Sequence, residues 1–194
     1  MVILMFKEFS HRHSDCTVDG SPGKVILSRD SKSTSIISRE YLYNAVFSPV
    51  SAVTRGSIIK TADTFFVQTL RLTTSEDKYC SLIKTNIEAE LQRYSNIYGE
   101  NKNIIDRAFT PVQTGIPAFA QHVTARMRME DMGLLPTTSY VLIIPVTVDV
   151  KTPQEAETTS LDRILLGGVA YQVNDVNRVK YPNLLQLQLS EDVR

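Results

Sequence analysis

The sequence of 194 residues has no tryptophan, no net charge and few of the residues that mark unusual protein classes. Glycine and proline occur 8 times each, which excludes collagen-like and low-complexity chains. The 21 basic residues are balanced by 21 acidic ones, whereas a dedicated nucleic-acid-binding protein usually carries a basic excess. With 42% hydrophobic residues, the chain has the composition of a soluble globular protein of one domain or two small ones.

Cysteines and long hydrophobic runs are also scarce. The two cysteines, Cys16 and Cys80, share no motif, and we expect free, half-buried thiols in a reducing compartment. The apolar run at residues 1–6 is too short for a signal peptide or a membrane span, and it predicts an N-terminal strand or an arm that docks on a neighbour. Residues 140–150 are also too few to span. We therefore expect a soluble protein with no membrane partner, made in a cytoplasm-like compartment.

A clear hairpin stands near the end of the chain. Residues 164–166 lead into Gly167-Gly168, and the strand that follows alternates apolar residues from Val169 to Val173. Both glycines can adopt a positive φ at no steric cost, as a two-residue primed turn requires. Another apolar strand, residues 184–189, follows after a Pro-Asn turn. This region therefore predicts a three-stranded meander.

Residues 55–71 resemble the first two strands of this meander. A constant offset places Ile58 on Ile164 and Phe65 on Tyr171, and a further apolar strand follows each copy. Because β-meanders share apolar spacing by chance, internal duplication and coincidence both stay open. In either case the same three-stranded unit is expected twice.

Alternation of apolar and polar residues predicts most other elements of the second half as strands. Residues 86–94 alternate in this way, although their good helix formers leave a helix as the alternative. Residues 119–130 alternate likewise, after a break at residues 115–117. Residues 140–144 are apolar on both faces, as expected of a central strand, and the alternation continues to residue 150.

The first half is less regular. Residues 7–24 are polar and rich in turn formers, and they predict an irregular segment followed by a short strand over residues 24–29. Residues 38–47 predict one or two helical turns, with Ser38 as N-cap. Two polar loops are expected, at residues 28–38 and 151–160.

Many short strands separated by turns predict a mainly β protein, an antiparallel β-barrel or β-sandwich with little helix. We expect two β-modules in tandem. The first, with an N-terminal arm, takes residues 1–85, and the second is a β-barrel module in residues 86–194.

Chemical motifs are lacking. The sequence contains no nucleophile elbow, P-loop or dinucleotide-binding glycine pattern. His11, His13, Asp15 and Cys16 are the only cluster of metal-ligand types, but no second ligand pair follows at a useful spacing, so chance clustering in a loop explains it better. The carboxylates have no acid–base partner at a defensible spacing. We therefore predict no catalytic, cofactor-binding or metal-binding residues, and a protein that is not an enzyme.

Arg126 and Arg128 are the candidate residues for a functional surface. The alternation over residues 119–130 places them on one face of a strand, with His122 in register. Such a face could meet phosphate, form salt bridges between subunits, or simply be solvated. Because aromatic residues do not interleave with these arginines, base stacking on an oligonucleotide-binding barrel has no support in the sequence.

A family resemblance rests on the region that contains the hairpin. The order Asp162-Arg163-Ile164, a Gly-Gly turn, Tyr171-Gln172-Val173, a Pro-Asn turn and a Leu-rich end resembles the C-terminal part of tailed-phage head-completion proteins, also called head–tail stopper, neck or connector proteins. Residues 116–121 are similar to the strand that follows an opening strand in these proteins. The resemblance covers residues 86–194, whereas residues 1–85 match it only through the repeated hairpin.

This resemblance implies a structural virion protein of the neck, assembled in the host cytoplasm. Its β-barrel protomers would form a homo-oligomeric ring, commonly a hexamer, between a portal or adaptor protein and a tail tube or tail terminator protein. Double-stranded DNA would pass through the lumen, and a neutral protomer suits a conduit in which a polyanion must slide. Two alternatives stay open: a ring protein of the tail-terminator or tail-tube type, and an oligonucleotide-binding-barrel module for single strands.

Overall fold

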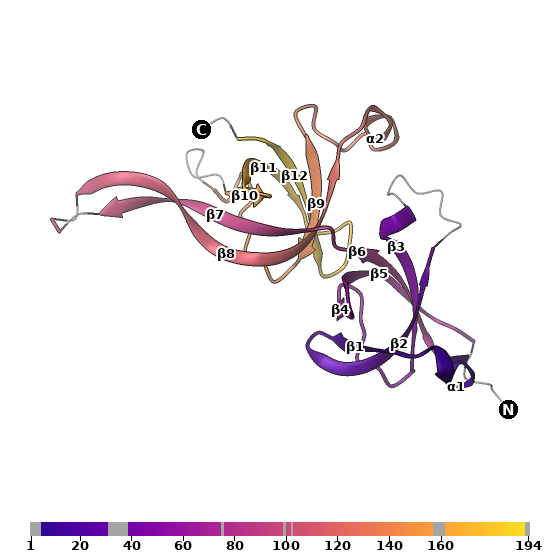
Figure 1. Cartoon of the computed structure of the whole chain (residues 1–194). Coiled ribbons are helices and arrows are strands. Elements are labelled where there is room, and N and C mark those ends of the chain that lie inside the picture. Colours follow the sequence, from indigo (N-terminus) through magenta and orange to yellow (C-terminus); the bar gives the residue numbers. More distant parts are fainter. Residues whose placement is uncertain are drawn as a thin grey trace. The chain divides into compact units, whose positions relative to one another are not determined.

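The computed structural model describes residues 5–30, 39–74, 76–98, 100–101, 103–156 and 162–192. The chain divides into two compact units, Met1–Asn86 with Tyr181–Asn183, and Ile87–Lys180 with Leu184–Arg194. Each unit contains one closed barrel of six antiparallel strands (Figure 1). The prediction of a mainly β protein with two tandem β-modules and little helix is confirmed.

The N-terminal barrel has the strand order β1-β2-β3-β6-β5-β4, and β4 pairs with β1 to close it. Its core is a cluster of buried side chains that includes Phe47, Phe65 and Leu82. The strands are β1 (Ser14–Val18), β2 (Ser21–Arg29), β3 (Leu42–Phe47), β4 (Ile58–Lys60), β5 (Thr64–Leu72) and β6 (Lys78–Lys84), with the short helical turns α1 (Met5–Glu8), η1 (Ser10–Arg12) and η2 (Arg39–Tyr41).

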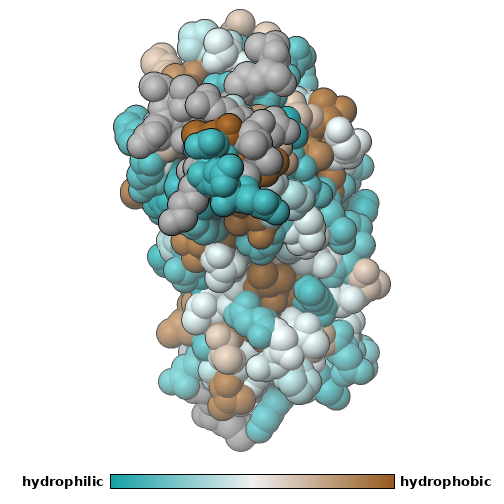
Figure 2. Space-filling view, turned by 90° about the vertical axis from the view of Figure 1, so that its left-hand side faces the viewer, coloured by the Kyte–Doolittle hydropathy of each residue, from teal (hydrophilic) through white to brown (hydrophobic). Residues whose placement is uncertain are grey.

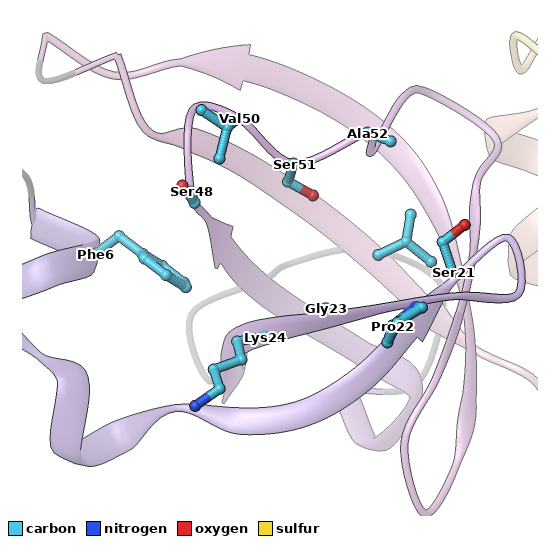
Figure 3. Close-up of a pocket in the computed structure, with 10 residues that line it drawn as sticks. Phe6, Ser21, Pro22, Gly23, Lys24, Ser48, Val50, Ser51 and Ala52 are labelled. Carbon is cyan, nitrogen blue, oxygen red and sulfur yellow. The ribbon is translucent and has the colours of Figure 1, made fainter.

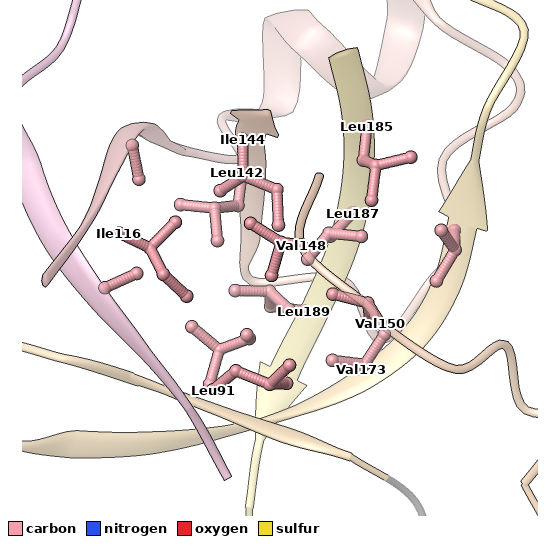
Figure 4. Packing of buried hydrophobic residues seen from close by; sticks show 14 of the residues in the cluster. Leu91, Ile116, Leu142, Ile144, Val148, Val150, Val173, Leu185, Leu187 and Leu189 are labelled. Atoms are coloured by element: carbon pink, nitrogen blue, oxygen red, sulfur yellow. The ribbon is translucent and has the colours of Figure 1, made fainter. Parts of the chain in front are cut away.

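The C-terminal barrel has the order β10-β11-β12-β9-β8-β7, closed by pairing of β7 with β10. Leu142, Leu187 and Leu189 pack inside it together with Val148 and Val150, which come from the loop after β9 (Figure 4). The elements are β7 (Ile87–Tyr98), β8 (Ile104–His122), α2 (Ala125–Glu130), β9 (Tyr140–Pro145), β10 (Arg163–Leu166), β11 (Val169–Asn177) and β12 (Leu184–Glu191).

The two barrels have the same topology. Read round from the closing strand, β4-β5-β6-β3-β2-β1 corresponds to β10-β11-β12-β9-β8-β7. The agreement extends to a β-bulge, because the pairing skips Gln68 in β5 and Asn174 in β11. These two residues are related by the same offset that relates Ile58 to Ile164. The predicted recurrence of a three-stranded unit is confirmed, and it extends to all six strands.

The C-terminal hairpin is formed as predicted. Gly167 and Gly168 have φ values of 58° and 86°, which places both in the left-handed region that a primed turn requires. The predicted strands over residues 86–94 and 140–144 are also confirmed, as β7 and β9.

Predictions for the first half were less accurate. Residues 7–24 are not irregular, because β1 and the beginning of β2 lie there. The described part of the predicted helical segment, residues 39–47, forms β3 after one 3-10 turn, since burial of side chains in the barrel outweighs local helix signals. The predicted N-cap, Ser38, lies outside the described residues. Met5 begins a short helix rather than continuing a strand, and residues 1–4 and 31–38 lie outside the described residues.

In the second half, the strand predicted over residues 119–130 is wrong beyond His122. The hydroxyl of Thr124 accepts a hydrogen bond from the Met127 N–H at 3.3 Å and caps α2, which takes the rest of the segment. The predicted break at residues 115–117 is also wrong, because β8 runs through Gly115. Residues 146–150 do not extend β9, and residues 157–160 of the predicted loop lie outside the described residues.

Among the described residues, no helix is long and apolar enough to cross a membrane.

Candidate assembly interface

The hairpin β7–β8 is much longer than the barrel to which it belongs. β7 pairs with β10 only over Ala89–Gln92, and β8 pairs with β9 only over Phe119–His122. Beyond these points the two strands pair with each other alone in the described part of the chain. They therefore leave the barrel as a two-stranded ribbon (Figure 1). We call residues 93–98 of β7 and 104–110 of β8 the arm.

The arm presents features that a monomer usually avoids. Within the described residues, no strand other than its partner pairs with either strand of the arm, so both outer edges are a template for pairing with another chain. Among the side chains of the arm that the structure describes, Ile97 is 39% exposed and Ile104 is 46% exposed. A two-stranded ribbon is also marginally stable by itself in water. The arm is thus suited to contact a partner that covers these edges.

The arm is anchored at its root by an ion pair between a partly buried arginine and a completely buried aspartate. Arg93, its first residue in β7, donates from Nε and Nη2 to the two carboxylate oxygens of Asp162 at 2.8 and 2.9 Å. The Asp162 side chain is completely buried, and it also accepts a hydrogen bond from the Lys151 N–H at 2.9 Å. These contacts favour the charged guanidinium, so the pKa of Arg93 is raised above its ordinary value, chiefly by the hydrogen bonds to Asp162.

Arg93 also reaches the loop after β9. Its Nη2 donates to the Asp149 carbonyl oxygen at 2.6 Å, and its Nη1 lies 3.2 Å from the exposed Asp149 carboxylate. The same loop places Val148 and Val150 in the barrel core. One guanidinium therefore joins the arm, the loop and the residue that precedes β10.

The second strand of the arm is held from β10. The Arg163 guanidinium carbon lies 3.9 Å from the centroid of the Phe109 ring, which is a cation–π contact. Its Nε donates to Gln92 Oε1 at 2.8 Å. The Phe109 ring in turn meets Tyr94, the residue opposite it in β7, edge to face at 5.2 Å.

A pocket of about 470 Å³ lies in the N-terminal barrel (Figure 3). It opens between Ser21–Lys24 of β2 and the loop Ser48–Ala52, with the Phe6 ring at one end. Phe6 is held in place because its N–H donates to the buried Asp77 carboxylate at 2.9 Å and its ring stacks on His13. Lys24 is the single charged residue among the described residues of the lining.

The two predicted surface arginines lie on α2 rather than on a strand. Positions two apart on a helix do not share a face, so the predicted basic strand face is wrong. Arg126 pairs with Glu130 at 2.7 Å, and Arg128 donates to the carbonyl oxygens of Leu135 and Thr138 at 3.0 and 2.5 Å. Their role in a DNA channel or between subunits stays a prediction.

The cluster at residues 11–16 does not converge. His13 lies against Phe6, with its Nε2 atom 2.8 Å from the Phe6 carbonyl oxygen. His11 belongs to the 3-10 turn η1. Cys16 points into the barrel core. Within the described residues, no three His, Cys, Asp or Glu side chains are placed to hold a metal ion. Both cysteines are free and buried.

Arg93 was not predicted from the sequence as a functional residue. Asp162 was noted only as part of a short motif, and the two residues are 69 positions apart. Their contact arises because β7 closes the barrel against β10, a pairing that no local pattern specifies. The available signal was the position of Asp162, a charged residue directly before the apolar strand β10. A charge at the start of a strand that pairs with another strand indicates that a cation lies close to it.

No family model matches this chain, and no curated protein matches it either. On the face shown in Figure 2, hydrophobic residues form small patches separated by hydrophilic ones.

Proposed function

We propose that this chain is a structural, non-enzymatic subunit of a tailed-phage neck, of the head–tail stopper or connector type. Its copies assemble into a ring, for which a hexamer is favoured. A portal or adaptor protein binds one side of the ring and a tail tube or tail terminator protein binds the other, with double-stranded DNA in the lumen.

The arm is the observation that carries this proposal. A closed barrel has no free edge, so pairing with a neighbour needs a strand that leaves it, and the arm supplies two open edges. An arm on one copy that contacts a different surface on the next makes a head-to-tail interface, and such interfaces close into rings when the rotation allows. The balanced charge of the chain also suits a channel that DNA must traverse without being held.

The first test is the state of assembly. We expect the purified full chain to form a ring at micromolar concentration, visible by negative-stain electron microscopy and with a defined mass in sedimentation velocity. The variant that tests the arm replaces residues 94–109 by Asn-Gly, which joins the paired residues Arg93 and Thr110 through a primed turn. This variant should keep the barrel fold by circular dichroism and sediment as a monomer.

Ile97→Ser is the matched control for surface polarity, since it changes one exposed arm residue and keeps both strand edges. It should weaken assembly less than removal of the arm. A full chain that stays monomeric at every concentration, or an armless variant that still forms the ring, contradicts the proposal. Salt-dependent binding of a labelled single strand by the monomer would instead support an oligonucleotide-binding module.

A further inference from the structure

We propose that Asp162 and Arg163 form a two-sided clamp that fixes the direction in which the arm leaves the C-terminal barrel. The two residues are adjacent, and each holds one strand of the arm. Asp162 binds Arg93 of β7 through two hydrogen bonds, and Arg163 covers the Phe109 ring of β8. The inference rests on these contacts and does not depend on ring formation.

The geometry explains why two adjacent residues suffice. Successive side chains of an extended strand point to opposite faces of the sheet, so Asp162 and Arg163 reach the arm from its two faces. A two-stranded ribbon can otherwise twist and bend freely about its root. Rotation toward either face would separate one of the two contacts, so the pair together opposes motion in both directions.

The base of the clamp is itself fixed. The Asp162 carbonyl oxygen accepts from the Val173 N–H at 3.2 Å, and Arg163 pairs with Gln172 of the same strand, β11. The Asp162 carboxylate is completely buried and receives a further hydrogen bond from the Lys151 N–H. Because no water competes for this carboxylate, we assign the larger share of the restraint to Asp162 and the smaller to Arg163.

The N-terminal barrel provides an internal comparison. The offset that relates the two barrels places Gly56 at the position of Asp162 and Ser57 at that of Arg163. The corresponding hairpin, β1–β2, ends in a tight turn at Asp19-Gly20 and has no arm. The clamp residues are thus present in the barrel that has an arm and replaced by small residues in the one that does not.

The test measures arm direction in the full chain by double electron–electron resonance. Spin labels are attached at Asn101→Cys, near the tip of the arm, and at Val169→Cys, an exposed position on the barrel. Cys16→Ala and Cys80→Ala remove the native thiols. The labelled chain is diluted into an excess of unlabelled chain, so that distances within one copy are recorded whether or not copies assemble.

The main variant is Arg93→Met combined with Asp162→Leu, which replaces this ion pair by apolar side chains of similar size and so leaves no unpaired charge in the barrel. We expect its distance distribution to be clearly broader than the parent's, while its circular dichroism melt is retained. Arg163→Gln removes the cation from the Phe109 ring and should broaden the distribution less. Lys84→Met, which breaks the Lys84–Asp63 pair in the N-terminal barrel, is the matched control and should change nothing.

A double variant that melts like the parent and keeps the parent's narrow distribution overturns the proposal. If the double variant does not fold, Arg163→Gln and Asp162→Asn decide it, because each keeps a polar side chain of similar size and removes one charged contact of the clamp. Unchanged distributions in both of these variants would then overturn it. Absence of rings in the undiluted protein would contradict the proposed function and leave the clamp standing.

Discussion

The two barrels share every strand pairing and differ in how two connections are used. In the N-terminal barrel, the β1–β2 hairpin turns at Asp19-Gly20, where both residues have positive φ. The loop after β3 places a single valine, Val53, in the core and borders a pocket together with β2. In the C-terminal barrel, the equivalent hairpin continues into the arm, and the equivalent loop fills the core with Val148 and Val150.

The difference shows that a closed barrel accepts large changes at its connections without a change of topology. Six strands pair in the same order in both units, so the pairing order does not depend on the length of a connection. A hairpin can then be lengthened into an arm, provided that its root is fastened. The Arg93–Asp162 ion pair holds the root of the arm in place. The N-terminal barrel has Gly56 at the position of Asp162, which cannot form such a pair.

The largest effect is expected when this ion pair is broken from one side. Arg93→Ala leaves the Asp162 carboxylate buried without its partner and should destabilise the C-terminal barrel by about 3–5 kcal/mol. Hydrogen exchange in urea, resolved by mass spectrometry, would follow each barrel separately. The N-terminal barrel should be unaffected, and a loss under about 1 kcal/mol would mean that the pair is not effectively buried.

Equivalent core positions should respond equally. Leu82 and Leu189 are both fully buried, and each pairs with the valine next to its barrel's bulge, Val67 or Val173. Leu82→Ala and Leu189→Ala should each cost about 2–5 kcal/mol in their own barrel, from lost burial and the cavity that remains. A difference of several kcal/mol between the two would show that the cores are packed differently despite their shared topology.

High pH should destabilise the N-terminal barrel through one buried thiol. Burial raises the pKa of Cys80 from 9.0 to about 12, and the C-terminal barrel contains no cysteine. The thiol stays protonated in the folded barrel and ionises in the unfolded chain, so its contribution is complete below pH 9 and is lost as pH rises toward 12.

Urea unfolding at pH 8 and pH 10 measures this loss. The N-terminal barrel should lose about 1 kcal/mol at pH 10 through Cys80. Cys80→Ala is the control, and it should remove this part of the pH dependence even if it lowers stability at both pH values. An identical slope in parent and control would contradict the assignment.

The smallest effect is expected at the surface of the N-terminal barrel. Lys84 and Asp63 are 2.8 Å apart, but their side chains are 30% and 44% exposed. Because water screens such a pair, Lys84→Met should cost less than about 1 kcal/mol in urea unfolding. A loss of stability equal to that of Arg93→Ala would mean that the ion pairs of the two barrels do not differ in strength.

The predictable part of this fold was the part coded locally. The Gly-Gly turn, the alternation in β7 and the wholly apolar β9 were readable from neighbouring residues, and the repeat followed from comparing residues 55–71 with the C-terminal hairpin. Residues 42–47 and 125–130 were not readable in this way. The first segment becomes a strand because its side chains are buried in the barrel, and the second is a helix capped by the Thr124 hydroxyl.

The contact between Arg93 and Asp162 could not be predicted from the sequence for a different reason. Arg93 and Asp162 meet across the seam where the last pairing closes the barrel, and closure is a property of all six strands together. The length of the arm was likewise hidden, because the break expected at residues 115–117 suggested a separate strand where β8 is continuous.

Each barrel takes its six strands from an uninterrupted stretch of chain, from Ser14 to Lys84 and from Ile87 to Glu191. Two sets of strands with the same pairing order could exchange partners, which is a known route to misfolding in repeated domains. Synthesis from the N-terminus at about 5–20 residues per second gives the first set several seconds to close before the last strand of the second set is made. Synthesis in order thus allows the N-terminal barrel to close before the strands of the C-terminal barrel, which share its pairing order, are complete.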